Sequence, residues 1–280
     1  MSSQGKARLG QNFLTSQSAA EDIVNALGDI AQSVVVEIGP GRGALTETLV
    51  KKAGRVIAIE IDRMLAAELR LAYSEQPNLE VLEGDVLTID FRTVLRPIGP
   101  LTDLRPLKPE PAQLVGNLPY YITSDILLRL FEFHDQFDRM VLMVQREVAD
   151  RIAARPGSRD YGLLSATAQL YTKVEKLFTL PPEVFSPPPK VYSTALLMRI
   201  APRFAEFGVP AREFIDFLKL AFGMKRKTLV NNLKPRYAPG KIGTALETAG
   251  LRPDVRAEAV SLEKSAEVFR ELRFAADRAD

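Results

Sequence analysis

Short apolar segments alternate with amphipathic ones along the first half of the chain. Five apolar segments rich in β-branched residues are predicted strands, at 33–39, 55–62, 79–85, 112–117 and 139–145. Their apolar positions are continuous rather than alternating, which is typical of strands buried on both faces of a parallel sheet. The segments 44–53 and 63–75 between them carry apolar residues at helical spacing. This order of elements predicts βαβ units and an α/β fold.

The pattern changes in two proline-rich stretches and again near the C-terminus. Residues 96–113 contain five prolines and are predicted to form a surface loop, because proline is excluded from helix interiors. Residues 180–200 are also rich in proline and end in an alternating strand. From about residue 211 the pattern is helical. We therefore predict a large sheet-containing domain at 1–205 and a small helical domain at 206–280.

Composition is that of an ordinary soluble protein and removes several kinds of chemistry. Of the 280 residues, 46% are hydrophobic and 26% charged. The chain contains no stretch of 18 apolar residues, so we predict no membrane span. The polar start lacks the apolar region of a secretory signal, so we expect a cytoplasmic protein. The absence of cysteine excludes thiolate nucleophiles, disulfides and iron–sulfur clusters. The single histidine, His134, cannot form a multi-histidine metal site, and we expect no metal.

A glycine-rich turn follows the first predicted strand. Gly39, Gly41 and Gly43 in VVVEIGPGRGALTETL lie between strand and helix, where glycine permits tight turning and close approach of a ligand. Glu60 ends the next strand, and a carboxylate there can accept hydrogen bonds from both ribose hydroxyls. Asp85 ends the third strand, where it could meet an adenine amino group. The alternative is a glycine turn beside a buried structural acid. The combination is similar to S-adenosylmethionine-dependent methyltransferases and favours a sulfonium nucleoside over a dinucleotide.

The motif NLPY follows the fourth predicted strand, so it lies at the ligand-binding edge of the sheet. An exocyclic amino group is a poor nucleophile, because its lone pair is delocalised into the ring. The side-chain oxygen of Asn117 and the carbonyl of Leu118 or Pro119 can accept its two N–H groups, which directs the lone pair toward a methyl donor. Tyr120 offers a flat face for stacking the base.

Two other interpretations of this motif differ in what they require. As a structural turn, it would precede a helix that the side chain of Ser124 could cap. As a site for methylation at carbon 5 of a pyrimidine, it would need a cysteine thiolate, which the chain lacks. The amino nitrogen of a flipped base is therefore the favoured target.

A basic segment lies in the predicted C-terminal domain. The net charge of +2 indicates little by itself. Between Phe217 and Leu246, however, the chain has no acidic residue and seven basic ones: Lys219, Lys225, Arg226, Lys227, Lys234, Arg236 and Lys241. This local excess favours contact with nucleic-acid phosphates, for which Lys225, Arg226 and Lys227 are the predicted residues.

Several blocks spread along the chain form a specific combination. They are LGQNFL, VVEIGPGRGALTETL, IAIEID, GNLPYYIT, MVQREVADRI, PGSRDYGLLS, FSPPPKVYS and AFGMKRKTLVNNL. In these blocks the chain resembles the small-subunit ribosomal RNA adenine N6,N6-dimethyltransferases. Three departures, Leu163, Tyr121 and Met224, avoid the residues of the predicted chemistry and concern details of RNA contact.

The resemblance implies a Rossmann-like S-adenosylmethionine-dependent methyltransferase domain, with an N-terminal arm at 1–20, followed by a small α-helical C-terminal domain. The implied cofactor contacts are Asn12, Leu14, Gly39, Gly41, Glu60, Asp85 and Asn117. The implied contacts with the target adenine are Asn117, Leu118, Pro119 and Tyr120, with Phe185 as a second stacking face.

The family transfers four methyl groups from S-adenosylmethionine to two adjacent adenines in the 3′-terminal hairpin loop of 16S rRNA, during assembly of the 30S subunit. The expected partner is the immature 30S subunit, and the expected state is a monomer away from membranes. One rival is a 23S rRNA adenine methyltransferase of the macrolide-resistance type, which FSPPPKVYS and KRKTLVNNL disfavour. The other is a non-catalytic rRNA-binding assembly factor, which the intact Glu60, Asp85 and NLPY set disfavours.

Overall fold

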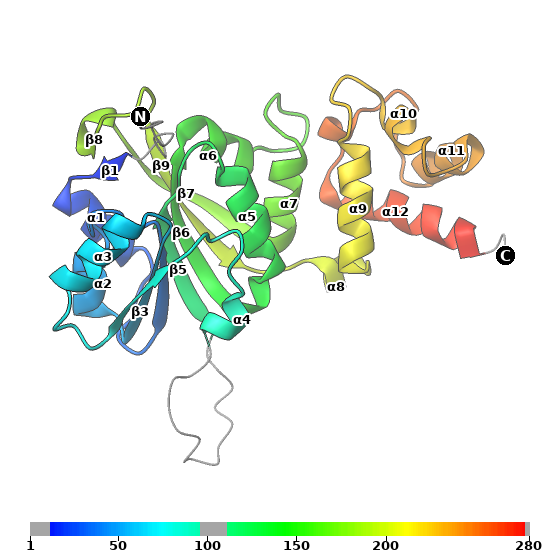
Figure 1. Cartoon of the computed structure of the whole chain (residues 1–280). Helices are drawn as coiled ribbons and strands as arrows, with labels where there is room; N and C mark the ends of the chain where they lie inside the picture. The colour runs from blue at the N-terminus through cyan, green and yellow to red at the C-terminus, as the bar shows by residue number, and fades with distance from the viewer. Residues whose placement is uncertain (1–11, 96–110, 278–280) are drawn as a thin grey trace, which may run out of the picture. The chain divides into compact units, whose positions relative to one another are not determined.

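The computed structural model describes residues 12–95 and 111–277, which divide into two compact units (Figure 1). The first unit contains the described residues up to Ala149 and the segment Glu175–Ile200. The second contains Asp150–Val174 and the described residues from Ala201 onward. The predicted domains, 1–205 and 206–280, stay a prediction. The compact units divide the chain differently, because the second unit also contains the earlier segment Asp150–Val174. The predicted loop at 96–113 lies mostly outside the described residues.

A seven-stranded sheet forms the centre of the first unit among the described residues. Its strands follow the order β4 (Leu79–Glu83), β3 (Arg55–Glu60), β2 (Val34–Ile38), β5 (Ala112–Asn117), β6 (Phe137–Gln145), β9 (Ser193–Ile200) and β7 (Thr172–Leu180). The first five are parallel, and β9 is antiparallel to β6. The chain proceeds outward from β2 to β3 and β4, then returns to the other side of β2 as β5. This reversal between β2 and β5 is the topological switch point, where ligands bind in such sheets.

Burial along the strands explains the continuous apolar pattern. In β2, β3 and β5 nearly every residue is buried, as expected for strands covered on both faces. The pattern predicted at the end of 180–200 differs from the structure, because Ser193–Met198 in β9 are all buried rather than alternately exposed. The physical reason is that side chains on both faces of β9 are packed: Ala195 and Leu197 belong to the core of the first unit, and the alternate residues Leu196 and Met198 are fully buried as well.

Helices cover both faces of this sheet (Figure 1). One face carries α1 (Gln17–Asn25), α2 (Thr46–Lys52) and α3 (Arg63–Ala72), and the other carries α4 (Phe91–Val94) and α5 (Thr123–Glu132). Local signals fix their starts: Ser16 caps α1, and the Asp62 side chain accepts hydrogen bonds from two backbone amides at the start of α3. The two helices predicted at 44–53 and 63–75 are confirmed as α2 and α3, each ending one to three residues earlier.

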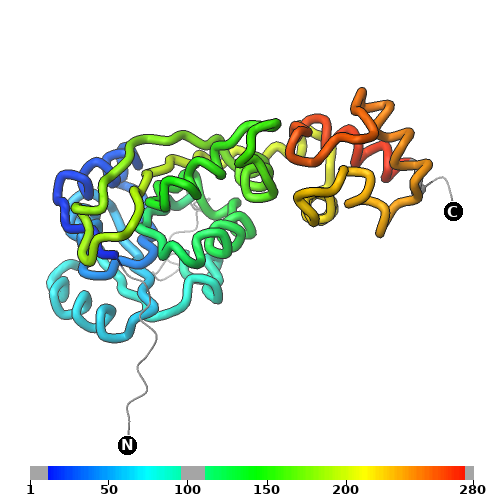
Figure 2. Tube along the Cα trace, turned by 90° about the horizontal axis from the view of Figure 1, so that it is seen from above, coloured from blue at the N-terminus to red at the C-terminus, as the bar shows by residue number. Residues whose placement is uncertain are grey.

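A short arm precedes α1 and is held by a distant part of the chain. Strand β1 (Phe13–Leu14) pairs antiparallel with β8 (Phe185–Ser186), which places Leu14 opposite Phe185. The backbone N–H and the hydroxyl of Thr15 both donate to the Val184 carbonyl, at 2.8 and 2.9 Å. In Figure 2 the blue N-terminal trace accordingly lies beside the yellow-green segment. The position of the arm therefore depends on residues about 170 positions later in the sequence.

The second unit is mainly helical. Its helices include α7 (Leu163–Tyr171), α8 (Phe204–Phe207), α9 (Ala211–Ala221), α10 (Leu229–Leu233), α11 (Pro239–Thr248) and α12 (Leu262–Asp277), and α6 (Arg146–Ile152) leads into it. Phe214, Phe217 and Phe269 form the centre of its core, with ring centroids 5.4 to 6.0 Å apart. Across the described ranges, no helix is long and apolar enough to cross a membrane.

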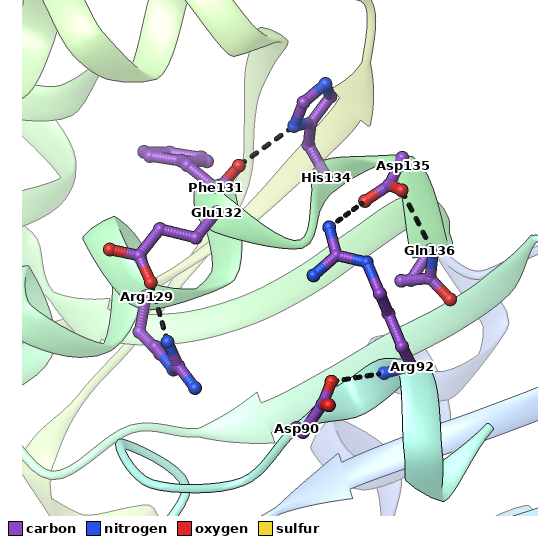
Figure 3. A network of polar contacts seen from close by, with 8 residues as sticks. All are labelled: Asp90, Arg92, Arg129, Phe131, Glu132, His134, Asp135 and Gln136. Atoms are coloured by element: carbon purple, nitrogen blue, oxygen red, sulfur yellow. Dashed lines mark hydrogen bonds and ion pairs between the residues drawn. The ribbon is translucent and has the colours of Figure 1, made fainter. Parts of the chain in front are cut away.

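The single histidine has a structural environment. His134 starts a 3₁₀ turn after α5, and its Nδ1 lies 2.9 Å from the Phe131 carbonyl (Figure 3). Beside it, Arg92 pairs with Asp135 at 3.3 Å, which joins the start of α4 to this turn. The ring does not line the cavity described below.

Candidate active site

A cavity of about 770 Å³, including its open mouth, lies at the carboxyl edge of the sheet around the switch point. The structure brings nine predicted site residues into its wall: Asn12, Gly39, Gly41, Glu60, Asp85, Asn117, Leu118, Pro119 and Tyr120. They come from the arm, from the ends of β2, β3, β4 and β5, and from the turn after β5. Residues far apart in the sequence thus converge where parallel strands end.

The glycine turn is shaped by contacts that exclude side chains. Gly41 has a φ of +57°, and a methyl group there would lie 2.7 Å from the Phe13 ring. Gly39 has a φ of +64°, and its N–H donates to the Ile59 carbonyl at 2.9 Å. Both positions use left-handed backbone conformations, which side chains disfavour. Gly39 is exposed at the cavity wall, whereas at Gly41 the room left by the missing side chain is taken by the Phe13 ring.

Glu60 is buried and holds the glycine turn in place. One carboxylate oxygen accepts from the Gly41 N–H and the other from the Asp62 N–H, both at 2.9 Å. Since a carboxylate has about four acceptor sites, each oxygen keeps capacity for one ligand hydroxyl. Asp85 is half-buried after β4, where its Oδ1 accepts from the Leu87 N–H at 2.9 Å. The two strand-end acids thus border one cavity with fixed orientations.

A second buried carboxyl lies behind the glycine turn. Glu37 in β2 accepts a hydrogen bond from the Thr46 hydroxyl at 2.7 Å and is 1% exposed. Burial, which outweighs the Thr46 hydrogen bond, together with the negative charge of Glu60 raises the pKa of Glu37 to about 7. A small adjoining cavity contacts Glu37, Gly39 and Asn117. The glycine turn is therefore flanked by acids on both sides.

Asn117 presents an acceptor without a donor. Its Nδ2 donates to the Asn12 carbonyl at 2.8 Å, which fixes the side chain. Its Oδ1 is buried and accepts no hydrogen bond from any described residue. The backbone carbonyls of Leu118 and Pro119 also differ in whether they accept a hydrogen bond. Pro119 accepts from the Ile122 N–H and the Thr123 hydroxyl, whereas Leu118 O has no donor among the residues described here. The free acceptors of the motif are thus Asn117 Oδ1 and Leu118 O.

NLPY leads through a turn into α5, but the cap proposed for that helix is absent. Helix α5 begins at Thr123 after Ile122, and no side chain caps it, so Ser124 is not the cap. Tyr120 is half-buried, and its hydroxyl lies 2.5 Å from Ser193 Oγ at the start of β9. Burial, more than the Ser193 hydrogen bond, sets the raised pKa of the Tyr120 hydroxyl. Tyr120 is therefore a fixed, neutral ring at the cavity wall.

Several wall residues were missed by sequence reasoning, and most are apolar. They are Phe13, Ile61, Val86, Tyr121 and Ile126. Ile61 and Tyr121 are 51% and 62% exposed, which is unusual for large apolar side chains. Ile61 directly follows Glu60, and Val86 directly follows Asp85. Ile61 and Val86 could have been identified as wall residues from the sequence, because each is an apolar residue that directly follows a strand-end acid.

The remaining predicted residues lie elsewhere. Leu14 and Phe185 are 6% and 3% exposed and belong to the core of the first unit, so neither lines the main cavity. In this structure the Phe185 ring is not available as a stacking face. Lys225, Arg226 and Lys227 are exposed in the turn between α9 and α10 of the second unit. Their predicted role in RNA binding stays a prediction.

Comparison with known proteins identifies the family. The model of the family described as ribosomal RNA adenine dimethylase matches residues 2–273. The chain belongs to this family. A ribosomal RNA small subunit methyltransferase A from Koribacter versatilis is 61% identical over 269 residues, covering 96% of this chain and 94% of that protein. A protein of the same name from Acidobacterium capsulatum is 50% identical, covering 97% and 93%.

Solved structures agree with this dimethylase family. A dimethyladenosine transferase from Plasmodium falciparum has a TM-score of 0.72 at 25% identity, covering 94% of this chain and 98% of that one. The 23S rRNA methyltransferase ErmE has a TM-score of 0.67 at 27% identity, covering 94% and 100%. The predicted fold class, a Rossmann-like methyltransferase domain with a small helical part, is confirmed, and so is the family predicted from the sequence blocks.

Proposed function

We propose that this protein transfers methyl groups from S-adenosylmethionine to the N6 amino groups of two adjacent adenines in small-subunit ribosomal RNA. Family membership and the names of the most similar relatives support this reaction and this class of RNA. The observation that carries the proposal is the buried Oδ1 of Asn117, which has no donor among the described residues; Asn117 lines the same cavity as two strand-end carboxylates.

The residues of the cavity fit S-adenosylmethionine. Glu60 retains acceptor capacity for ribose hydroxyls, and Asp85 can accept from an adenine amino group. Ile61 and Val86 offer apolar surface beside these acids, which suits the faces of a purine. At Gly39 the missing side chain leaves backbone open to the ligand, and Gly41 lines the same cavity. When bound, the cofactor supplies an electrophilic methyl group on a sulfonium centre.

The NLPY motif orients the amino group to be methylated. Within residues 12–95 and 111–277, no group donates to Asn117 Oδ1 or Leu118 O, so these two acceptors can hold the two N–H groups of N6. Leu118 O is preferred over the alternative, Pro119 O, which already accepts two hydrogen bonds. Holding both protons localises the nitrogen lone pair, and orientation of this kind accounts for large rate effects. Tyr120 packs against the base and stays neutral, so it is not the proton acceptor.

The finer parts of the proposal concern the RNA. The proposed site is the 3′-terminal hairpin loop of 16S rRNA in the immature 30S subunit, bound by a monomer. Loop bases unstack at low cost, which suits an enzyme that removes its target from the helix. The exposed Lys225, Arg226 and Lys227 are proposed phosphate contacts. The fold also matches ErmE, so the names of the similar relatives, rather than the fold, favour the small subunit over 23S rRNA.

Methyl transfer to ribosomal particles tests the proposal. Purified protein, labelled S-adenosylmethionine and unmethylated 30S subunits are incubated at low magnesium, and the modified nucleotides are located by primer extension. Label in two adjacent adenines near the 3′ end of 16S rRNA is the expected result, with Asn117→Ala as the inactive control. Stops in 23S rRNA would assign the protein to the other rRNA. No incorporation in any particle would favour an assembly factor without activity.

A further inference from the structure

Beyond the target pocket, the same edge of the sheet carries an exposed aromatic ring paired with an arginine. Tyr192 immediately precedes β9 and is 45% exposed. The Arg146 guanidinium lies over its ring at 5.2 Å from the centroid, and the Arg146 N–H donates to the Tyr192 carbonyl at 2.9 Å. This distance is that of a cation–π contact. The ring is thus held in place while almost half of the residue stays accessible.

Strand order places this pair next to NLPY. Asn117 ends β5, Gln145 ends β6 just before Arg146, and Ser193 begins β9 just after Tyr192. Because β9 is antiparallel to β6, its start lies at the carboxyl edge, and Gln145 is registered opposite Ser193. Two strand spacings of roughly 4.8 Å separate β5 from β9, or about 10 Å. The Ser193 hydroxyl also contacts the Tyr120 hydroxyl, so Tyr192 is one residue from a direct contact with the target motif.

Two basic side chains belong to this segment: Arg146, which lies over the ring, and Lys190, two residues before Tyr192 in the sequence. Neither Arg146 nor Lys190 makes an ion pair with a residue in the described ranges, and both are exposed. Lys190 and the half-exposed Val191 lie between the prolines of FSPPPKVYS and Tyr192. An aromatic face with adjacent free cations is the combination that binds single-stranded RNA, through base stacking and phosphate contact.

We propose that Tyr192, with Arg146 and Lys190, is a second nucleobase site that stacks the base adjacent to the adenine in the target pocket. The proposal rests on the proposed function, since two adjacent adenines must be presented in turn. Tyr192 stacks the waiting or already modified neighbour, and the two cations contact the flanking phosphates. The site adds affinity for the RNA substrate and sets which nucleotide enters the pocket, without touching the reacting atoms.

A cycle of binding measurements tests the stacking contact. A labelled hairpin RNA with two adjacent loop adenines is compared with the same RNA carrying an abasic nucleotide at one of them, by fluorescence anisotropy without S-adenosylmethionine. We expect Tyr192→Ala to weaken binding of the intact RNA about 5- to 100-fold, the range for losing one base–aromatic stack. For the abasic RNA the same substitution changes affinity less than about 2-fold, because the partner base is already absent.

Two further variants separate stacking from a structural effect. Tyr192→Phe keeps the ring and restores most of the affinity lost in Tyr192→Ala. Leu71→Ala removes another exposed apolar side chain, 79% exposed at the far end of α3 from the carboxyl edge, and serves as the matched control with both RNAs unchanged. In steady-state transfer to the intact RNA, Tyr192→Ala raises KM by the same factor as it raises the dissociation constant, with kcat nearly unchanged.

Equal weakening of both RNAs by Tyr192→Ala, or no weakening of either, overturns the second base site. The outcome is independent of the proposed function, because binding is measured without turnover. A wild-type protein that shows the expected coupling but never transfers methyl groups would overturn the proposed function and leave the base site standing.

Discussion

The amide of Asn117 combines a chemical role with a structural one, because in the described part of the chain its oxygen is a free acceptor and its nitrogen makes a hydrogen bond. The oxygen is buried without a donor among the described residues, and the nitrogen holds the Asn12 carbonyl at 2.8 Å. Asn117→Ala removes both. Loss of the hydrogen bond costs about 1 kcal/mol, whereas removal of a buried unsatisfied acceptor recovers about 1–3 kcal/mol. The net change in unfolding free energy therefore lies between about zero and a gain of about 2 kcal/mol. The melting temperature should not fall, and it should rise by at most about 8 °C.

Transfer should respond very differently. Removing one positioned hydrogen-bonding group at a reacting centre typically lowers the rate by about 10² to 10³. We expect Asn117→Ala to lose transfer to at least this extent while RNA affinity stays nearly intact. Single-turnover transfer from labelled S-adenosylmethionine measures the chemical step, and anisotropy with the hairpin RNA measures binding.

Asn117→Asp is the matched variant, because it keeps acceptor oxygens and loses only the donor to Asn12. A carboxylate next to that carbonyl displaces the arm, so cofactor affinity should fall together with transfer. If Asn117→Ala keeps transfer within about tenfold of the wild-type rate, the acceptor role is wrong. If transfer and RNA affinity fall equally in Asn117→Ala, the residue is structural.

Three other predictions concern the remaining charged groups. Glu60→Ala should weaken S-adenosylmethionine binding about 100-fold or more before it affects RNA binding, because charged hydrogen bonds to ribose are lost; unchanged affinity in calorimetry would contradict this. The folded-state pKa of Glu37, raised from 4.5 to about 7, means that the folded protein binds more protons than the unfolded one between these values, so stability is lost as pH rises through this window. The stability lost in this window is up to about 3 kcal/mol. Glu37→Gln does not titrate, so its melting temperature minus that of the wild type should be larger at pH 8 than at pH 5. If this difference is the same at both pH values, Glu37 does not titrate in this range. Replacing Lys225, Arg226 and Lys227 with Ala should weaken RNA binding at all sequences and lower the slope of log K against log salt by about 2 to 3, whereas an unchanged slope would place the phosphate contacts elsewhere.

Much of the cavity could be predicted because parallel strands bring their ends together. Once the strands at 33–39, 55–62 and 79–85 are recognised, the positions of Glu60 and Asp85 follow from the topology of the sheet. The same reasoning placed Asn117 at the end of β5. These residues lie where the backbone pattern itself puts them, so no knowledge of side-chain packing was needed.

Other features depend on packing that the pattern does not encode. The choice between the Leu118 and Pro119 carbonyls required the hydrogen bonds from Ile122 and Thr123. Phe185 carries a suitable ring for stacking, yet its pairing opposite Leu14 buries it in the core. The role of Ile61 in the wall depends on its 51% exposure, which an apolar strand-end residue does not reveal. Sequence reasoning thus found the polar groups and missed the apolar surface between them.

The pairing of β1 with β8 has a consequence for how the protein is made. The contact between Thr15 and Val184 joins residues 169 positions apart, so it closes one of the longest loops in the chain. A ribosome adds residues from the N-terminus, and the glycine turn, both strand-end acids and NLPY are all synthesised before β8 exists. The pairing of β1 with β8 and the two hydrogen bonds from Thr15 to Val184 can form only after β8 has emerged. The arm is therefore fully held only late in synthesis, when the first unit is nearly complete.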